Sequence, residues 1–267
     1  MTQRNELHAL LDPVRRVALD AGAAIMDIYR TPFTVERKTD YSPVTAADMA
    51  AHHVILDGLE RLTPGVPVVS EESKLAPYEQ RRHWHTYWLI DPLDGTREFI
   101  KRNGEFTVNI ALIVDGVSVL GAVCVPGQCL CYGAYQGGGS SKQCASGTSE
   151  PIVTRPWDGG HLVVAGSRSQ GLEAFERFVK QFESCEVLRV GSSLKMCYIA
   201  EGRADVYLRY GPISEWDTAA AQCVLENAGG AVLDLNMQPL RYNTKDSVLN
   251  PSFIAIGDVK HDWRRYL

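Results

Sequence analysis

Two short apolar runs end directly in acidic residues, and this pattern constrains the fold more than any other feature of the chain. Residues 66–70 lead into Glu71, and residues 87–90 lead into Asp91 and Asp94. Short apolar runs of this kind predict buried strands. Open α/β sheets usually bind their ligands beyond the carboxyl ends of the strands. We therefore expect an α/β fold with its functional site at these two strand ends.

Another carboxylate, Asp217, lies at the start of a helix predicted over residues 217–228, which Gly229 and Gly230 close as a C-cap. Each acidic residue alone is compatible with an ordinary turn or an N-cap. Together they favour a site for Mg²⁺, which prefers oxygen ligands. Sites with two metal ions about 3.5–4 Å apart serve in-line phosphoryl displacement and need several carboxylates. The pattern thus indicates Mg²⁺-dependent phosphoryl transfer.

Composition excludes some classes of partner. The 267 residues are 45% hydrophobic, which is enough for a substantial core. The net charge of −5 provides no general electrostatic attraction for nucleic acid. Charged residues interrupt the first thirty positions, and no run approaches 18 apolar residues. We expect a soluble, cytoplasmic protein without stable membrane insertion, a monomer or weak dimer. Association with the inner face of the membrane is left open.

The seven cysteines include no Cys-x-x-Cys pair, and several lie within apolar runs. We therefore expect reduced thiols that pack as small hydrophobic residues. Cys129 and Cys131 lack the second cysteine pair that a zinc site would need, so we interpret them as packing residues.

Two helices are predicted before residues 66–70, the first segment with a clear strand pattern. Asp12 and Pro13 resemble an N-cap and a first helical residue, and apolar residues at helical spacing follow. Thr45 and Asp48 have the spacing of a capping box and open a second helix, which extends to about Leu62.

A β-hairpin is predicted over residues 106–125, with its turn at Asp115 and Gly116, and a further strand over 130–135. The Gly- and Ser-rich stretch that follows resembles a boundary, so we divide the chain into halves at residues 1–150 and 151–267. The second half alternates strands with helices. Its predicted strands are 162–165, 187–190, 206–210 and 253–256, and its helices lie near 170–182, 192–201 and 217–228.

Two motifs resemble the paired signatures of the inositol monophosphatase superfamily, a group of lithium-sensitive, Mg²⁺-dependent phosphatases. They are Trp88-Leu-Ile-Asp91-Pro-Leu-Asp94-Gly-Thr96 and Trp216-Asp217-Thr-Ala-Ala220 with Ala228-Gly-Gly230. The stretches Gly95–Leu112 and Gly191-Ser-Ser-Leu-Lys195 are similar to its bacterial CysQ-type branch, the 3′(2′),5′-bisphosphate nucleotidases. The resemblance implies a sandwich of alternating helix and sheet layers, formed by two closely packed halves.

The resemblance also implies roles for individual residues. The ligands of two or three Mg²⁺ ions would be Glu71, Asp91, the Leu93 carbonyl, Asp94 and Asp217. Catalysis would involve Glu71 and a pair, Thr96 and Asp48, in which Thr96 orients the attacking water and Asp48 accepts its proton. Glu72 would support this site from nearby.

The implied substrate is a small nucleotide bisphosphate, 3′-phosphoadenosine 5′-phosphate, which would be hydrolysed to AMP and phosphate in sulfur metabolism. Lys195 and Arg209 would hold the retained phosphate. The full set implied to bind substrate is Gly95, Thr96, Ser192, Ser193, Lys195, Arg209 and Asp217. Further positive charge would come from Lys38, Arg97, Lys101 and Arg102.

Two positions depart from the family pattern: Gln170 stands where His is common, and Ala221 where Gly is common. An alternative function is an inositol-phosphate or sugar-phosphate phosphatase, which would share the metal ligands. A nuclease is disfavoured because the acidic chain offers no basic track. A non-catalytic ligand-binding relative is the alternative from another class.

Overall fold

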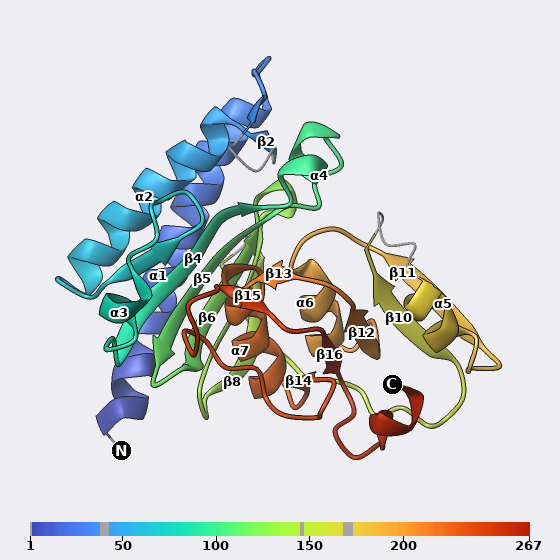
Figure 1. Ribbon diagram of the computed structural model, residues 1–267. Coiled ribbons are helices and arrows are strands. Elements are labelled where there is room, and N and C mark those ends of the chain that lie inside the picture. Colours follow the sequence, from blue (N-terminus) through green and yellow to red (C-terminus); the bar gives the residue numbers. More distant parts are fainter. Residues whose placement is uncertain (1, 38–42, 145–146, 168–172) are drawn as a thin grey trace.

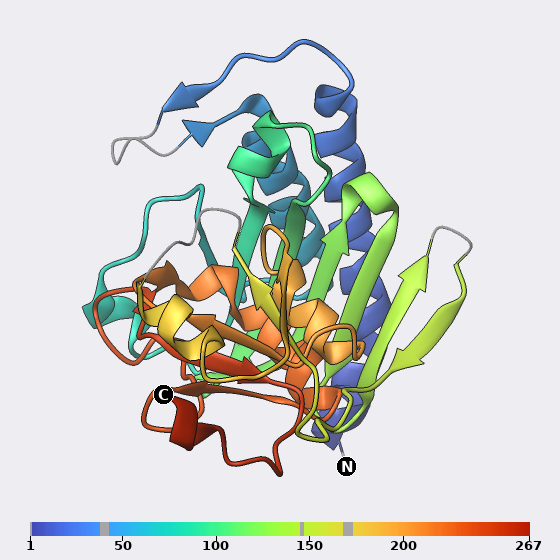
Figure 2. The same cartoon turned by 90° about the vertical axis from the view of Figure 1, so that its right-hand side faces the viewer.

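The computed structural model describes residues 2–37, 43–144, 147–167 and 173–267. Helices and sheets alternate in layers, as Figure 1 shows and Figure 2 presents from the side. The helices are α1 (Thr2–Tyr29), α2 (Ala46–Leu62), α3 (Tyr78–Arg81), α4 (Thr96–Ile100), α5 (Glu173–Val179), α6 (Leu194–Ala200) and α7 (Ala219–Asn227), with 3₁₀ turns η1 (Pro126–Gln128), η2 (Glu215–Asp217) and η3 (Trp263–Tyr266). The α/β class and the layered sandwich are confirmed.

The first sheet has the order β3-β4-β5-β6-β7-β8-β9, parallel between β3 and β4 and antiparallel elsewhere. Its strands are β3 (Val68–Ser70), β4 (Thr86–Asp94), β5 (Thr107–Val114), β6 (Val117–Val125), β7 (Leu130–Tyr135), β8 (Gly139–Cys144) and β9 (Ser149–Ile152). Helices α1 and α2 cover one face of this sheet, and α7 packs on the other (Figure 1).

The second sheet has the order β11-β10-β12-β16-β14. Its strands are β10 (Leu162–Gly166), β11 (Cys185–Arg189), β12 (Val206–Arg209), β14 (Ala231–Asp234) and β16 (Phe253–Ile256). Two small pairs complete the strands: β1 (Glu36–Arg37) with β2 (Pro43–Val44), and β13 (Ile213–Ser214) with β15 (Leu249–Asn250). Helices α6 and α7 lie between the two large sheets and fill the central core with buried residues.

Helix α1 begins at Thr2, eleven residues before the predicted first helical residue Pro13, so the prediction that Asp12 caps it was wrong. Pro13 lies inside the helix and removes one backbone donor. Leu7 and Leu11 are buried in the same cluster as Val14, and their burial outweighs that loss. The second predicted helix is confirmed, because Thr45 and Asp48 form the expected capping box at the start of α2.

The predicted hairpin is confirmed by β5 and β6. Asp115 and Gly116 both have positive φ, 49° and 75°, as a type I′ turn requires. The Gly- and Ser-rich stretch beyond β7, which the sequence suggested as a loop, instead contains β8 and β9. The first sheet therefore continues to Ile152, two residues past the proposed division of the halves.

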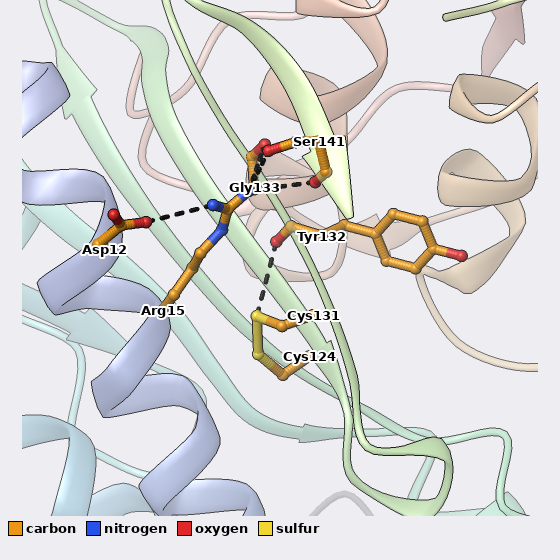
Figure 3. The surroundings of a disulfide bond; sticks show 7 residues. All are labelled: Asp12, Arg15, Cys124, Cys131, Tyr132, Gly133 and Ser141. Carbon is orange, nitrogen blue, oxygen red and sulfur yellow. Dashed lines mark hydrogen bonds and ion pairs between the residues drawn. A yellow bond between two sulfur atoms is a disulfide. The ribbon is translucent and has the colours of Figure 1, made fainter. Parts of the chain in front are cut away.

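The expectation of reduced thiols was wrong for two cysteines. Cys124 of β6 and Cys131 of β7 are direct cross-strand partners with Cα atoms 4.0 Å apart, and they form a disulfide (Figure 3). Cys129 lies in the intervening turn as an exposed free thiol, so the interpretation of Cys129 as a packing residue was also wrong. Among the described residues, no helix combines the length and apolar character needed to cross a membrane.

Candidate active site

Three acidic residues from both halves of the chain converge on one point. Glu71 follows β3, Asp91 belongs to β4, and Asp217 ends η2. One carboxylate oxygen from each lies within 4.8 Å of the other two. The sequence predicted this meeting of two strand ends with the start of a helix. The extra 3₁₀ turn at Asp217 was not predicted.

Asp91 has a carboxyl group suited to binding a cation. Its Oδ1 atom accepts the Leu93 N–H at 3.0 Å, while the buried Oδ2 atom has no hydrogen-bond partner in the described part of the chain. Burial raises the pKa of Asp91 well above its usual value, and the neighbouring charge of Glu71 raises it further. A divalent cation would relieve both effects, and an all-oxygen ligand set matches the preference of Mg²⁺.

Asp94 is held by residues that are distant in sequence. Its Oδ2 atom accepts the backbone N–H of Ser193 at 2.6 Å and the side-chain amide of Asn109 at 3.5 Å. Burial raises the pKa of Asp94 to about 6, although Lys195 and the Ser193 N–H oppose the shift. A β-bulge between Asp91 and Asp94 changes the register of β4 against β5. The carboxylates therefore lie at an irregular strand end, as the sequence predicted, and not in the ordinary turn with which each residue alone was compatible.

Sequence reasoning missed Asn109, which also accepts the Ser193 hydroxyl at 2.7 Å. The signal was present, because Asn109 interrupts the apolar run of β5 and is fully buried. A buried polar side chain in a strand requires a partner. Ser193 also contacts the Thr107 hydroxyl at 2.8 Å. This network links β5 to the segment before α6 and fixes one side of Asp94.

Thr96 and Asp48 lie together as predicted. The Thr96 hydroxyl donates to Asp48 Oδ1 at 3.4 Å, and the other carboxylate oxygen accepts the Thr45 N–H and hydroxyl, both at 2.8 Å. The capping box therefore orients Asp48 toward the first turn of α4. Gly95 adopts φ 91° just before that turn, where an added Cβ would lie 3.3 Å from the Glu105 carbonyl. A left-handed conformation with little free space favours glycine here.

A cleft of about 580 Å³ contains most of the predicted site. Besides the carboxylates, its lining includes Lys195 and Arg209. Lys195 is 7% exposed, and its ammonium group lies 5.3 Å from the centre of the Tyr207 ring. Burial lowers the pKa of Lys195, while Asp94 opposes this shift. The cleft therefore places positive charge close to the acidic cluster. Tyr207, which also lines it, was not predicted.

The two serines before α6 differ in their surroundings. Ser193 is the N-cap of α6, and its N–H donates a hydrogen bond to Asp94 Oδ2. Ser192 has φ 51°, lines the cleft, and accepts a hydrogen bond from Lys195 through its carbonyl at 2.5 Å. Of the two predicted substrate contacts here, Ser192 thus retains groups for a ligand, while Ser193 chiefly organises Asp94.

Of the further basic residues, Arg97 and Lys101 line the cleft. Arg102 instead donates to the carbonyls of Tyr29 and Thr31, at 2.5 and 2.9 Å, and so ties the turn after α4 to the end of α1. Lys38 and Gln170 lie outside the described residues. Ala221 is buried within α7, between Ala220 and Gln222, which are also buried.

The same fold occurs in known proteins. A profile of the inositol monophosphatase family matches residues 6–262. The chain belongs to the inositol monophosphatase family. Within this family, the chain is 48% identical over 246 residues to the "3′(2′),5′-bisphosphate nucleotidase CysQ" of Escherichia coli strain K12. The alignment covers 91% of this chain and 98% of that protein.

A more distant family member, the CysQ protein of Buchnera aphidicola, is 38% identical and covers 95% of this chain and 96% of its own length. Among solved structures, CysQ from Bacteroides thetaiotaomicron superposes with a TM-score of 0.80 at 40% identity, covering 92% of this chain and 95% of that one. An inositol monophosphatase from Zymomonas mobilis superposes with a TM-score of 0.76 at 27% identity, covering 97% and 95%. The family thus includes both kinds of phosphatase that the sequence suggested.

Proposed function

We propose that this protein is a Mg²⁺-dependent 3′(2′),5′-bisphosphate nucleotidase that hydrolyses 3′-phosphoadenosine 5′-phosphate to AMP and phosphate. One observation carries the proposal: a single cleft combines an all-oxygen acidic cluster with Lys195 and Arg209. The name of the Escherichia coli relative, at 48% identity, supports the same substrate class. We further propose a role in sulfur assimilation.

The proposed metal ligands are Glu71, Asp91, the Leu93 carbonyl, Asp94 and Asp217, which would hold two or three Mg²⁺ ions. The chemistry that Mg²⁺ supplies at such a site is a lower pKa for water and stabilisation of charge on the leaving oxygen. Asp48 would accept a proton from the attacking water, which Thr96 would orient. Water provides the hydroxyl group that ends on phosphorus and the proton that ends on the 3′ oxygen.

The retained 5′-phosphate is assigned to Lys195 and Arg209. The buried ammonium group of Lys195 is weakly screened by solvent, so its attraction for a phosphate is stronger than that of a surface lysine. Arg209 donates to the Pro212 carbonyl at 3.3 Å, which fixes its side chain beside the cleft. Ser192 and Gly95 would contribute backbone groups to the same substrate.

Apolar side chains on the remaining wall of the cleft would accommodate the base. Ile213, Trp216 and Leu249 line this part of the cleft, and Leu249 is 42% exposed. Apolar and aromatic surface combined with a few charged groups is typical of sites for small ligands. An inositol phosphate would leave this surface and the two cations unused.

Measurement of phosphate release from 3′-phosphoadenosine 5′-phosphate and from inositol 1-phosphate, with Mg²⁺ or with EDTA, would test the proposed function. Wild type should prefer the nucleotide and lose activity in EDTA, and Asp94→Asn should lose most activity on both substrates. A preference for inositol phosphate would keep the metal site and refute the assignment of Lys195 and Arg209. No release from either substrate would favour the non-catalytic alternative.

Two finer expectations belong to the same proposal. We propose that the enzyme works in the cytoplasm as a monomer or weak dimer. Sedimentation across a range of protein concentrations would test the oligomeric state. Inhibition by Li⁺, relieved by added Mg²⁺, would follow from competition between small hard cations for the same oxygen ligands.

A further inference from the structure

Segment 242–250 of the second half encloses the turn that presents Asp217. The Asn243 N–H donates to Glu215 Oε2 at 3.0 Å, and the Glu215 N–H donates to the Val248 carbonyl at 2.8 Å. Glu215 is the first residue of η2, and Asp217 is the last. The segment therefore fixes the beginning of the turn through both the side chain and the backbone of Glu215.

The same segment also holds the residues on either side of the turn. The Asn250 amide donates to the Ser214 carbonyl at 3.1 Å and to the Thr218 hydroxyl at 2.9 Å. Thr218 lies 3.2 Å from the Tyr242 hydroxyl. Because residues before and after Asp217 are both bonded to segment 242–250, a shift of this segment would carry the Asp217 carboxylate with it.

Arg81, at the end of α3 in the first half, holds segment 242–250 in place. Its guanidinium group donates to Asn243 Oδ1 at 2.5 Å, to the Lys245 carbonyl at 3.2 Å and to the Asp246 carbonyl. The side-chain amide of Asn243 in turn donates a hydrogen bond to the Arg81 carbonyl at 2.6 Å. Arg81 is only 1% exposed, so water does not compete readily for these bonds.

The position of Arg81 in the chain gives the contact its importance. Helix α3 lies in the connection between β3, which precedes Glu71, and β4, which carries Asp91. Glu71 and Asp91 belong to the first half, Asp217 to the second, and their oxygens lie within 4.8 Å of one another. Like charges this close repel. The bonds of Arg81 connect the segment between β3 and β4 to segment 242–250 of the second half, and so oppose movement of Asp217 away from Glu71 and Asp91.

We propose that Arg81 is a positioning residue for the divalent-cation site, which it completes by fixing Asp217 against Glu71 and Asp91 through Asn243 and Glu215. The proposal rests on the proposed function in that the acidic cluster must bind metal. It does not depend on which phosphate ester is the substrate. Partners that bond directly to metal ligands typically change metal affinity 10–100-fold when they are removed. Because Arg81 acts through Asn243 and Glu215, the lower end of that range applies.

The test uses Arg81→Met, with Arg15→Met as the matched control. Arg15 is also a buried arginine, 4% exposed, and it donates to the Gly133 carbonyl, the Ser141 carbonyl and the Ser141 hydroxyl (Figure 3). These bonds join α1 to β7 and β8, away from the acidic cluster. The control therefore loses a comparable set of buried bonds without touching segment 242–250.

A third variant, Asn243→Gly, separates the Arg81 link from the rest of the segment. Asn243 has φ 56°, which glycine adopts without strain, and the backbone N–H to Glu215 is kept. Only the side-chain bonds to Arg81 are lost. This variant carries the test if Arg81→Met does not fold.

Binding of Mn²⁺ to each substrate-free protein is measured by calorimetry, beside thermal unfolding and the Mg²⁺ dependence of phosphate release. We expect Arg81→Met to weaken Mn²⁺ binding about tenfold or more, and Asn243→Gly to weaken it in the same direction. Saturating Mg²⁺ should restore most of kcat. Arg15→Met should lower the melting temperature but bind Mn²⁺ as wild type does.

Unchanged Mn²⁺ binding in the folded Arg81 and Asn243 variants would overturn the proposal, as would equal weakening in Arg15→Met. If the wild type binds Mn²⁺ and the variants show the expected order, but the nucleotide is not hydrolysed, the positioning role stands and the proposed substrate is wrong. Absence of Mn²⁺ binding to the wild type would overturn the positioning role.

Discussion

Replacing Lys195 by methionine tests the assignment of the second phosphate. Methionine keeps most of the apolar stem that packs near Tyr207 but removes the ammonium group. Burial lowers the pKa of Lys195, and the attraction of Asp94 opposes that effect. Removing the ammonium group therefore removes both the free-energy cost of burying its charge and its favourable attraction to Asp94, and the two effects partly cancel. We expect only a small change in the melting temperature.

The loss of substrate affinity should be larger. A hydrogen bond to a charged group contributes about 1.5–3 kcal/mol, and a side chain that is 7% exposed should fall near the middle of that range or above it. A loss of about 2 kcal/mol corresponds to a roughly 30-fold lower kcat/KM. This factor should apply to 3′-phosphoadenosine 5′-phosphate. Adenosine 3′-monophosphate lacks the retained phosphate and should be affected much less.

The assay compares kcat/KM for these two substrates in wild type and Lys195→Met at saturating Mg²⁺. Any indirect effect of Lys195 on Asp94 alters both substrates alike and cancels in the ratio. We expect the preference for the bisphosphate to fall by about the same 30-fold factor. An equal decrease on both substrates would refute the assignment and give Lys195 a role at the metal site instead.

Three further outcomes are expected. Burial raises the pKa of Asp94 to about 6, so its ionisation should lower the stability of the metal-free protein as pH rises from about 4 through 6. The affinity for Mg²⁺ should rise over the same interval. Melting curves and Mg²⁺ titrations at pH 5 and 7.5 would test this, and a metal-free protein that is more stable at pH 7.5, or Mg²⁺ binding that is weaker there, would contradict it. Gly121→Ala should destabilise by about 2 kcal/mol or more, because the new Cβ would lie 2.3 Å from the Ala220 carbonyl of α7; urea unfolding with an unchanged midpoint would contradict this close packing. Reduction of the disulfide between Cys124 and Cys131 should cost up to about 2 kcal/mol, because the bridge closes a short loop within a hairpin that is already paired; equal urea midpoints with and without dithiothreitol would show that the bridge adds nothing.

Elements with strong local signals were predicted well. The capping box at Thr45 and Asp48, and the turn at Asp115 and Gly116, depend on residues within four positions of one another. The three acidic positions were predicted to converge because strand ends and helix starts meet at one edge of an α/β sheet. Local patterns predict the strands and the helix, and the topology of an α/β sheet then brings their ends together.

Other features depend on contacts that local patterns do not encode. Strand β8 is rich in Gly and Ser, which are weak strand formers, and it pairs because β7 offers it an edge. The bond between Ser193 and Asp94 joins residues 99 positions apart. Pro13 resembled a helix start because proline is common there, and only the burial of Leu7 and Leu11 showed otherwise.

The acidic cluster draws its members from positions 71, 91 and 217, so the proposed binding of a cation there would be linked to the lifetime of the protein. An unfolded chain does not bring these residues together, so a bound cation stabilises only the folded form. At 100 times its dissociation constant, such a ligand adds about 2.7 kcal/mol to folding. Loss of the cation would increase the population of open forms and, with it, the rate of proteolysis. The concentration of the free cation around the protein would then control its abundance as well as its activity.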